Sequence, residues 1–375
     1  MRIFINLLFL RPGKVGGTET FTVNLVKNLL EIDTKNEYLL ILSRNNKKNF
    51  DFAFQKSKFL ECDFDNNSRL KRVSFEQFTL PKKLKEQKAD LLIAPANTGL
   101  INSPCKQLLI IHDLIYFVYP EYFSWVKRTY LKNLVKYSCK KAIRIVTVSQ
   151  NTKDDIIKYV GEEEEKIDII YEGVDFEKFS KTAREEGQNF VQKQYGIQKY
   201  IYSPTSLYPH KNNDSLIKAF AKLKTTKKIP QKLIITGNDP YKKIDWLKNV
   251  ILECKMENEV FYLGRVPSEH LPYLYSGADL TTYLSSYEGF GLPVLEAMAA
   301  SCPVLSSNRS SLPEIVGDAA ILVNPFEIDE IANKMNELLT DEKLRKECIT
   351  KGLKRAKEFS WENVAKRLIQ TYNKL

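Results

Sequence analysis

The chain has 375 residues, which favours two domains, because a single hydrophobic core stops growing at about 250–300 residues. Hydrophobic residues make up 43% of the chain and charged residues 27%, a balance that excludes an intrinsically disordered protein. The formal net charge of +11 favours a polyanionic partner, and the charge alone leaves nucleic acid, anionic lipid and phosphorylated substrates open.

The six cysteines include no Cys-x-x-Cys pair, which argues against a disulfide framework and a zinc site and indicates reduced thiols in the cytosol. No apolar run approaches the ~18 residues that span a bilayer. Residues 3–10 follow a basic residue, as in a signal peptide, but Asn6 interrupts them and no small-residue cleavage site follows. We interpret them as a buried first strand and expect a cytoplasmic protein.

Short apolar runs alternate with helical patterns along the first half of the chain. The strand at residues 3–10 is followed by an expected helix at 18–30. Runs that are apolar on both faces are typical of buried parallel strands, and the helices between them supply the crossovers. Further strands are expected at residues 38–43, 90–94, 107–112 and 143–149.

The same alternation starts again at Lys199. Helices are expected, for example, at residues 214–223 and 245–255. This repetition predicts two open α/β sheets with helices on both faces, each a Rossmann-like, doubly wound domain. The strands of the second sheet are expected at residues 200–203, 232–236, 260–263, 280–284, 303–306 and 320–323.

The segment at residues 175–189 is polar and charged, with little apolar periodicity, so we expect the interdomain linker there. The predicted domains are an N-terminal domain at 1–178 and a second domain at 190–358. Residues 360–375 form an amphipathic pattern that begins at Ser360, a typical helix N-cap, and they are expected to be a C-terminal helix.

The densest motif contains two glutamates that flank a glycine-rich turn. Gly289 and Gly291 would let a ligand approach the backbone, and the amides of a helix N-terminus attract phosphate or sugar oxygens. Pro293 suits the first turn of a helix, which would place Glu296 about one turn inside it and Glu288 in the loop. A capping carboxylate beside a solvated glutamate would give the same spacing. The motif reads Tyr287-Glu288-Gly289-Phe290-Gly291-Leu292-Pro293-Val294-Leu295-Glu296.

Residues 288–299 resemble the E-x7-E motif of the GT-4 family of retaining glycosyltransferases, whose usual form is close to EGFGLPxLEAMA. The resemblance continues through residues 302–304, 310–315 and 317–320 and covers nearly the whole chain. It implies a GT-B fold, in which two Rossmann-like domains face each other across a cleft and the C-terminal helix returns to the N-terminal domain. The first domain would bind the acceptor and the second the nucleotide-sugar, without a metal or another cofactor.

The resemblance also implies roles for individual residues. Glu288 would contact a hydroxyl of the donor sugar, together with the backbone amides of residues 289–291. Glu296 would hold the ribose hydroxyls of the nucleotide. Leu292 would line the cleft for the diphosphate and the ribose.

Lys211 matches the family lysine that neutralises the donor diphosphate. A nucleoside diphosphate gains negative charge as it leaves, and fixed cations and backbone dipoles can meet that charge. Many relatives have an arginine at the position of Ser206, and another subgroup has one at the position of His210, so the second cation at the phosphate is left open. Arg265 is a candidate replacement, although in the family the backbone of its loop faces the base.

Two features of the first block complete the expected site. Gly16 and Gly17 lie between the first strand and the first helix, where their amides could approach the diphosphate as the family's glycine loop does. His112 follows an apolar strand, and in similar enzymes this histidine approaches the donor sugar near the reacting carbon. His112, Lys211 and Glu288 are therefore our catalytic candidates, with a satisfied core histidine as the alternative for His112. Only three histidines occur, and we expect no metal site.

Residues 125–144 contain seven Lys or Arg residues and no acid. Five of these cations recur every four residues, which predicts one broad basic face on a helix interleaved with aromatic residues. Such helices often lie on anionic membranes, and a peripheral position at the inner face of the cytoplasmic membrane would suit a polyprenyl-diphosphate-linked acceptor. An ordinary solvated helix is the alternative, and nucleic acid is disfavoured because no recognised binding module appears. The five cations are Arg128, Lys132, Lys136, Lys140 and Arg144.

The segments at residues 112–114 and 119–121 look most like those of bacterial mannosyltransferases of surface-polysaccharide assembly. The expected reaction is therefore the retaining transfer of mannose from GDP-mannose to a lipid-linked or oligosaccharide acceptor. The alternatives are a UDP-sugar-dependent hexosyltransferase and a non-catalytic scaffold in a glycan assembly complex. An epimerase would need more acid–base groups, and a phosphorylase would need a longer chain with a lysine for pyridoxal phosphate.

Overall fold

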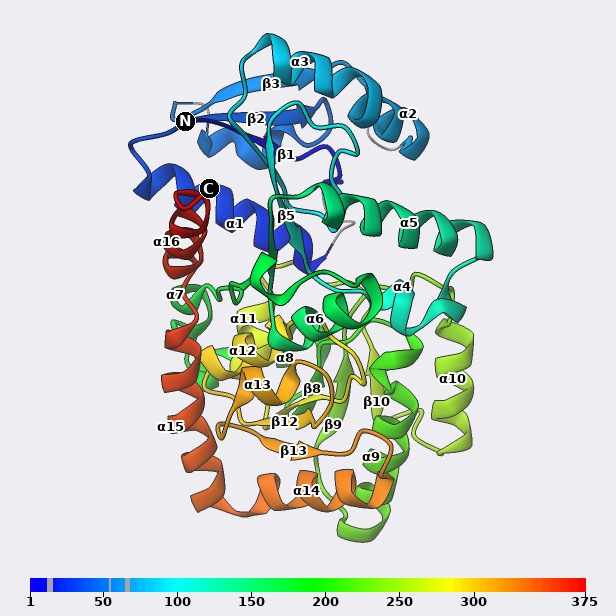
Figure 1. Cartoon of the computed structure of the whole chain (residues 1–375). Coiled ribbons are helices and arrows are strands. Elements are labelled where there is room, and N and C mark those ends of the chain that lie inside the picture. Colours follow the sequence, from blue (N-terminus) through cyan, green and yellow to red (C-terminus); the bar gives the residue numbers. More distant parts are fainter. Residues whose placement is uncertain (12–15, 54, 65–67) are drawn as a thin grey trace. The chain divides into compact units, whose positions relative to one another are not determined.

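The computed structural model describes residues 1–11, 16–53, 55–64 and 68–375 (Figure 1). The chain forms two compact units, the first from Met1–Gly173 and Trp361–Leu375 and the second from Val174–Ser360. Each unit contains one sheet, and all of the strand pairs in the described part of the chain are parallel. The two parallel α/β sheets predicted from the apolar runs are confirmed.

The first sheet has the strand order β3-β2-β1-β4-β5-β6-β7. The strands β3 and β7 were not predicted from the sequence, because β3 mixes exposed and buried residues and β7 has only three residues. The strands are β1 (Arg2–Asn6), β2 (Glu37–Ser43), β3 (Lys58–Cys62), β4 (Leu91–Ala94), β5 (Lys106–Ile111), β6 (Arg144–Thr147) and β7 (Ile167–Ile169).

Helices cover both faces of the first sheet, as neighbouring residues of β2 show. Leu39 packs in one apolar cluster with Leu80 and Leu84, whereas the hydroxyl of Tyr38 contacts Tyr372 of the C-terminal helix. The helices of this unit are α1 (Gly17–Ile32), η1 (Lys47–Ala53), α2 (Arg69–Ser74), η2 (Phe75–Thr79), α3 (Leu80–Glu86), α4 (Ile115–Val118), η3 (Pro120–Tyr122), α5 (Trp125–Lys141), α6 (Gln150–Asp155), η4 (Ile156–Val160), η5 (Glu164–Lys166) and α16 (Trp361–Tyr372).

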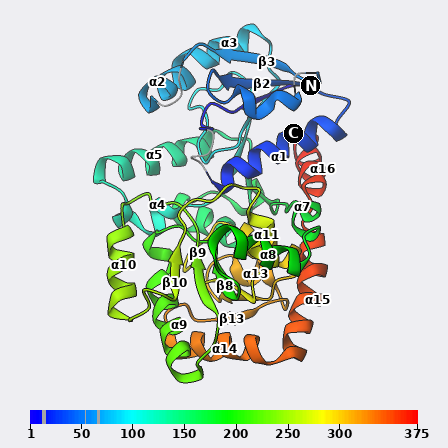
Figure 2. The ribbon, with the colours of Figure 1, turned by 180° about the vertical axis from the view of Figure 1, so that it is seen from behind.

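The C-terminal helix α16 packs along α1, and both views of the ribbon show them side by side (Figures 1 and 2). The rings of Phe21 and Trp361 meet edge to face, 5.8 Å between centroids. A Cβ on Gly173 would lie 2.6 Å from the backbone nitrogen of Trp361, so a larger residue there would push the helix away. The expected return of this helix to the N-terminal domain is confirmed.

The second sheet has the strand order β10-β9-β8-β11-β12-β13. Its strands are β8 (Tyr200–Ser203), β9 (Lys232–Ile235), β10 (Val260–Tyr262), β11 (Leu280–Tyr283), β12 (Val304–Ser307) and β13 (Ile321–Val323). Its helices are α7 (Phe176–Ser180), α8 (Arg184–Tyr195), η6 (Pro209–Lys211), α9 (Asn213–Lys227), α10 (Ile244–Glu253), α11 (Leu271–Ser276), α12 (Leu292–Ala299), α13 (Leu312–Val316), α14 (Ile328–Thr340) and α15 (Glu342–Glu358).

The strand β8 shows that this sheet is also covered on both faces. Ile201 joins an apolar core with Leu216 of α9 and Met335 of α14. The next residue, Tyr202, points to the other face and meets the ring of Tyr275 of α11 at 5.0 Å. The predicted doubly wound arrangement therefore holds for this unit.

The prediction of a linker at residues 175–189 was wrong, because this segment forms α7 and the first half of α8 within the second unit. Gly187 explains the packing, since a Cβ there would lie 2.3 Å from Ser276 Oγ and 2.6 Å from the backbone nitrogen of Gly277. The close approach of α8 to α11 requires a glycine, a signal that a search for apolar periodicity does not register.

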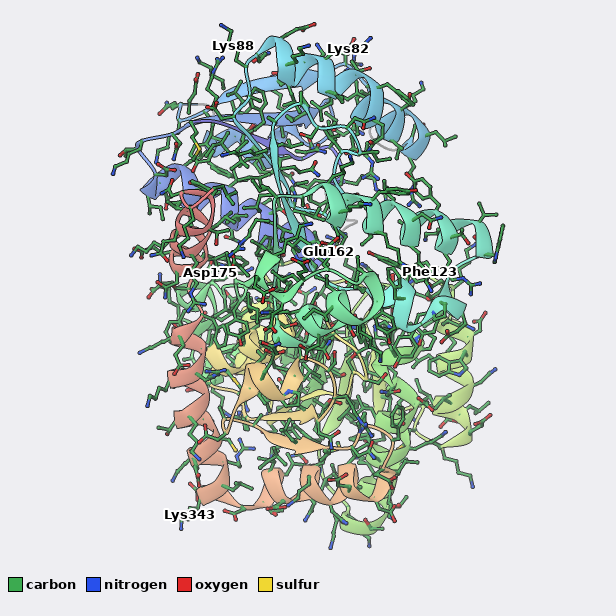
Figure 3. All side chains as sticks on the ribbon, viewed as in Figure 1. Lys82, Lys88, Phe123, Glu162, Asp175 and Lys343 are labelled. Atoms are coloured by element: carbon green, nitrogen blue, oxygen red, sulfur yellow. The ribbon has the colours of Figure 1, made fainter. Side chains whose placement is uncertain are left out.

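The predicted basic helix exists as α5 but ends at Lys141. Arg144 is not part of the basic face of this helix, because the β-branched residues after position 142 join the sheet and Arg144 begins β6. Its side chain pairs with Asp168 at 2.7 Å. Positive charge also occurs elsewhere on the surface, since the exposed Lys82, Lys88 and Lys343 project outward from their units (Figure 3). Among the described residues, no helix has the length and apolarity to cross a bilayer.

Candidate active site

The second sheet reverses its strand order between β8 and β11, and the loops after these two strands carry the predicted donor residues. At such a point the connections that follow the two parallel strands run to opposite sides and leave a crevice at the carboxyl ends of the strands, where α/β sheets bind ligands. The short helix η6 with Lys211 follows β8, and the loop with Glu288 follows β11. The topology therefore brings both residues to one edge of the sheet.

Lys211 and Glu288 form an ion pair, with Lys211 Nζ donating to Glu288 Oε1. The ammonium also donates to the hydroxyl of Tyr283 at 3.1 Å and lies 5.2 Å from the centre of its ring. The side chains of Lys211 and Glu288 are 11% and 15% exposed. Burial opposes ionisation of Glu288, but Lys211 and further hydrogen bonds outweigh burial and lower the pKa of this carboxyl. The site thus holds a charged pair that is largely buried.

Two serines fix the backbone of the glutamate loop. Ser310 Oγ donates to the carbonyl oxygen of Glu288 at 2.8 Å and accepts from its amide at 3.1 Å. Ser311 Oγ donates to the carbonyl oxygen of Phe290 at 2.7 Å. No role was predicted from the sequence for these serines or for Tyr283. Their hydroxyls hold the loop in one conformation, which orients Glu288.

Gly291 connects this loop to α12 and cannot be replaced freely. Its φ of 118° lies in a region that side chains other than glycine rarely adopt. A Cβ there would also lie 2.7 Å from Leu312 Cδ2. Phe290 is 4% exposed and packs against Phe359 at 5.9 Å, so its contribution to a ligand would come through the backbone. Leu292 begins α12.

Glu296 lies one turn inside α12, as the position of Pro293 predicts. The hydroxyl of Tyr275 donates to Glu296 Oε2 at 2.7 Å. Burial raises the pKa of Glu296 to about 7, although Tyr275 and Lys178 act in the opposite direction. This carboxyl therefore changes its charge near neutral pH, unlike Glu288.

The second cation at the phosphate is not supplied by His210. Burial and the neighbouring Lys211 lower the pKa of this histidine to about 3, so it is neutral at physiological pH. Its carbonyl oxygen instead accepts the amide of Ser286 at 2.8 Å, which ties η6 to the glutamate loop. The carbonyl oxygen of Ser206 accepts from Asn213. Arg265 is exposed on the loop after β10, an edge strand that β9 separates from β8.

The remaining candidates lie in the first unit. Gly16 has a φ of 68° and precedes α1, and a Cβ there would contact nothing within 4 Å; the loop before it, 12–15, lies outside the described residues. Gly17 begins α1. His112 is 5% exposed, with Nδ1 3.2 Å from Glu172 Oε1 and Nε2 3.0 Å from the carbonyl oxygen of Pro95. Each ring nitrogen thus lies within hydrogen-bonding distance of an acceptor oxygen of its own unit.

The described part of the chain contains no group of three or more His, Cys, Asp or Glu side chains that could hold a metal ion.

The fold resembles solved glycosyltransferase structures. The crystal structure of HepE from Anabaena in complex with UDP and glucose matches with a TM-score of 0.78 at 21% identity and covers 100% of both chains. Sucrose-phosphate synthase from Thermosynechococcus elongatus matches with a TM-score of 0.79 at 16% identity and covers 100% of this chain and 98% of that one. At these identities the likeness concerns the fold alone, and it confirms the predicted GT-B architecture.

Curated relatives are similar in sequence, and two are given as examples. O-antigen chain mannosyltransferase B of Escherichia coli is 33% identical over 264 residues, which cover 70% of this chain and 69% of that protein. A Campylobacter jejuni enzyme, N-acetylgalactosamine-N,N'-diacetylbacillosaminyl-diphospho-undecaprenol 4-alpha-N-acetylgalactosaminyltransferase, is 30% identical over 239 residues, which cover 63% of this chain and 61% of that enzyme.

Family profiles match both halves of the chain. The profile described as Glycosyltransferase Family 4 matches residues 15–178, and the profile described as Glycosyl transferases group 1 matches residues 185–355. The second match contains the paired Lys211 and Glu288 together with Glu296. The chain therefore belongs to the group 1 glycosyl transferases and is a glycosyltransferase.

Proposed function

We propose that the protein transfers mannose from GDP-mannose to a lipid-linked or oligosaccharide acceptor in the synthesis of a bacterial surface polysaccharide, with retention of the anomeric configuration. The observation that carries the proposal is the buried pair of Lys211 and Glu288 at the switch point of the second sheet. The choice of mannose is supported by the name of the Escherichia coli relative.

Lys211 has a direct electrostatic role in this proposal. When the bond between the anomeric carbon and the diphosphate breaks, negative charge grows on the phosphate oxygens. A bound diphosphate would attract Lys211 Nζ, which Tyr283 keeps close to the glutamate loop, and a fixed cation in a largely buried site stabilises such charge strongly. The transfer then needs no metal ion to meet the charge of the leaving group.

Glu288 and Glu296 would orient the donor. Glu288 is ionised, because Lys211 lowers the pKa of its carboxyl, and an ionised carboxylate accepts hydrogen bonds from sugar hydroxyls. Glu296, which Tyr275 positions, would accept the ribose hydroxyls. The amides of residues 289–291 and of Gly16 and Gly17 would add donors to the sugar and the diphosphate.

The proposed chemical step conserves atoms and charge. The acceptor hydroxyl attacks the anomeric carbon from the face that the diphosphate leaves, and its proton passes to the departing phosphate oxygen. The new glycosidic bond therefore has the configuration of the donor. His112 would assist by exchanging its hydrogen bond to the Pro95 carbonyl for one to the sugar.

The acceptor would carry a polyprenyl diphosphate, as the name of the Campylobacter jejuni relative indicates for that enzyme. The basic helix α5 would contact anionic membrane, because Trp125 is 69% exposed and Tyr137 is 55% exposed among its lysines. Binding to vesicles of anionic phospholipid, compared between the native protein and Lys136→Glu, tests this contact.

Two other functions stay open as competitors. A UDP-sugar-dependent hexosyltransferase would use the same pair, because Lys211 meets a diphosphate and not a base. A scaffold without catalysis would bind no donor.

The experiment that separates these functions measures the melting temperature with GDP, UDP, ADP and dTDP, with and without EDTA. A ligand at about 100 times its Kd adds about 2.7 kcal/mol of stability. We expect GDP alone to stabilise the protein in EDTA, and Lys211→Ala to abolish the shift. Lys343→Ala, which removes an exposed cation of the same unit, is the control and should retain it.

If UDP stabilises the protein instead, the donor is a UDP-sugar and the assignment of GDP-mannose is wrong. If none of the four nucleotides shifts the melting temperature, the protein is a scaffold without a donor site. Release of GDP from GDP-mannose, with the anomeric configuration of the product read by NMR, then tests turnover and retention.

A further inference from the structure

A second switch point, in the first sheet, contains two adjoining cavities of about 330 and about 160 Å³. The strand order reverses between β1 and β4, and residues that follow both strands line the cavities. The two cavities share Asn6 at the end of β1, Arg72 of α2, Glu76 of η2, and Asn97 and Thr98 after β4. This is the place where an open α/β sheet binds its ligand, and none of the donor residues of the second unit lies in it.

The linings of these cavities contain more arginine than acidic side chains, so their formal charge is positive. Arg69 and Arg72 line the smaller cavity and Arg11 the larger one. Glu76 is the acidic side chain in the linings, and Asn6 donates to it at 3.0 Å. Arg72 Nε lies 3.8 Å from Glu76 Oε2, which is too far for a hydrogen bond. Arg69 lies over the ring of Tyr130 at 5.6 Å.

The crowding of these cations also affects their ionisation. Burial and then the nearby Arg72 lower the pKa of Arg69, and burial and then Arg69 lower the pKa of Lys127. Burial raises the pKa of Glu76, so this carboxyl offers its neighbours less negative charge than an exposed one would. The positive charges of this cluster repel one another, and a bound anion would reduce that repulsion.

Two buried polar atoms in the smaller cavity lack partners. Tyr116 is 5% exposed, yet its hydroxyl forms no hydrogen bond with any residue of the described chain. Arg72 Nε is likewise buried without an acceptor among those residues. Buried donors are nearly always paired in folded proteins, so these two indicate a ligand that accepts hydrogen bonds.

Exposed apolar side chains come from three elements that line the cavities, α2, η2 and α5. Leu70 is 85% exposed and lies between Arg69 and Arg72 on α2, and Phe78 is 74% exposed on the next turn of helix. Trp125 and Val126 are 69% and 71% exposed on α5, the helix that contributes Tyr130 to the lining. An anionic group attached to a hydrocarbon chain fits such a combination of cations and apolar side chains.

We infer that this pocket binds the diphosphate of a lipid-linked acceptor, an assignment that rests on the proposed transferase function. Arg69 and Arg72 contact the phosphate oxygens, and the hydroxyl of Tyr116 donates a hydrogen bond to the same group. Asn97 and Thr98 face the first sugar beyond the diphosphate. The apolar residues of α2 and α5 accept the start of the lipid chain.

The test is isothermal titration calorimetry of the full-length protein with farnesyl diphosphate. Loss of a charge-assisted hydrogen bond should weaken binding about tenfold in Arg72→Gln, and loss of a neutral one about threefold in Tyr116→Phe. Tyr116→Phe removes only a hydroxyl that has no partner in the described chain, so its melting temperature should not fall. Lys82→Gln removes an exposed cation of the same unit and should bind like the native protein.

Two comparisons identify the bound group. Lys211→Ala should bind farnesyl diphosphate like the native protein, and loss of binding in that variant alone would overturn the inference by moving the diphosphate to the donor site. Farnesol lacks the diphosphate and should bind at least about tenfold more weakly, since hydrogen bonds to charged groups are the strong ones. Equal binding of farnesol would also overturn it.

The source of the phosphate is tested with vesicles of phosphatidylglycerol. If such vesicles compete with farnesyl diphosphate and their binding also falls in Arg72→Gln, the pocket recognises a membrane headgroup and the acceptor assignment is wrong. Failure of the proposed function looks different: no nucleoside diphosphate would stabilise the protein, while farnesyl diphosphate would still bind in a manner that depends on Arg72.

Discussion

Lys211 and Glu288 form a buried ion pair although 77 positions separate them in the chain. The pair exists because β8 and β11 are adjacent in the sheet, so the loops at their carboxyl ends meet. Ser310 and Ser311, from the loop after β12, hold the glutamate backbone from the other side. Three neighbouring strands therefore position one charged pair.

Removal of the lysine alone should be costly. In Lys211→Met, the carboxylate of Glu288 stays buried without its cation, and we expect the free energy of unfolding at neutral pH to fall by about 3 kcal/mol. Urea denaturation measures this change. The double variant K211M/E288Q removes both charges and should recover most of the stability without recovering nucleotide binding. A double variant as unstable as the single one would contradict the electrostatic explanation.

Glu296 should make stability depend on pH in an unusual direction. Burial raises the pKa of Glu296 from 4.5 to about 7, so between these values the folded state holds a proton that the unfolded state releases. The native protein should therefore lose stability as the pH rises through this window. Glu296→Gln cannot ionise and should be about 2 kcal/mol more stable than the native protein above the window, after allowance for partial solvent screening. Equal stability of the two proteins below the window is the internal control.

The same carboxyl should control nucleotide affinity. If its ionised form accepts the ribose hydroxyls, GDP should bind more tightly as the pH rises through about 7, the pKa of Glu296. Titration calorimetry at several pH values measures this trend. The trend should be absent in Glu296→Gln, and a variant that keeps the native pH dependence would show that another group is responsible.

Gly291 should resist substitution for two separable reasons. In Gly291→Ala the backbone keeps a strained φ of 118° and the new Cβ meets Leu312 Cδ2, so we expect a loss of about 3 kcal/mol and weaker donor binding. Gly161→Ala is the matched control, since Gly161 has a φ of 82° but open space around it, and it should cost only about 1 kcal/mol. Similar losses in both variants would show that the contact with Leu312 is unimportant.

The C-terminal helix should be held by one hydroxyl. Tyr372 donates to Asp33 Oδ2 at 2.6 Å and lies 2.6 Å from the hydroxyl of Tyr38. Burial opposes ionisation of Asp33, but hydrogen bonds from Asn36, Tyr372 and Tyr38 outweigh burial and lower its pKa to about 2. The stability from this carboxylate is present above its unfolded pKa of 3.8 and is lost as the pH falls towards 2.

Tyr372→Phe should therefore lower the free energy of unfolding by about 1.5 kcal/mol at neutral pH and move acid unfolding to a higher pH. Circular dichroism during an acid titration measures the midpoint. Tyr137→Phe changes an exposed hydroxyl of α5 and should leave the midpoint unchanged. An unchanged midpoint in Tyr372→Phe would show that packing of α16 on α1, and not the hydroxyl, holds the helix.

Local patterns predicted much of the fold and part of the site. Apolar runs at the buried strands, such as residues 38–43 and 200–203, locate both parallel sheets, because a strand buried on two faces must be apolar throughout. Pro293 correctly places Glu296 inside α12. The short or half-exposed edge strands β7 and β3 were missed, because such strands carry no continuous apolar signal.

The errors also follow from physical causes. The basic pattern through Arg144 keeps its spacing of four, but pairing of β6 with β5 ends the helix at Lys141, and spacing does not record a competing strand. The segment at residues 175–189 is polar, yet it contains α7 and the start of α8, and Gly187 lets α8 pack closely against α11. In both cases a partner distant in the sequence decides the local structure.

The sequence by itself determined the class of the protein. The order of apolar runs set two α/β units, and the motif from Glu288 to Ala299 identified the glycosyltransferase family. These properties are local, since turn residues and strand periodicity act over a few positions. Only the tertiary structure decided the partners of each charge. The pairing of Lys211 with Glu288, the neutral state of His210 and the arginine-lined pocket of the first unit depend on strand order and burial, which act between residues far apart in the chain.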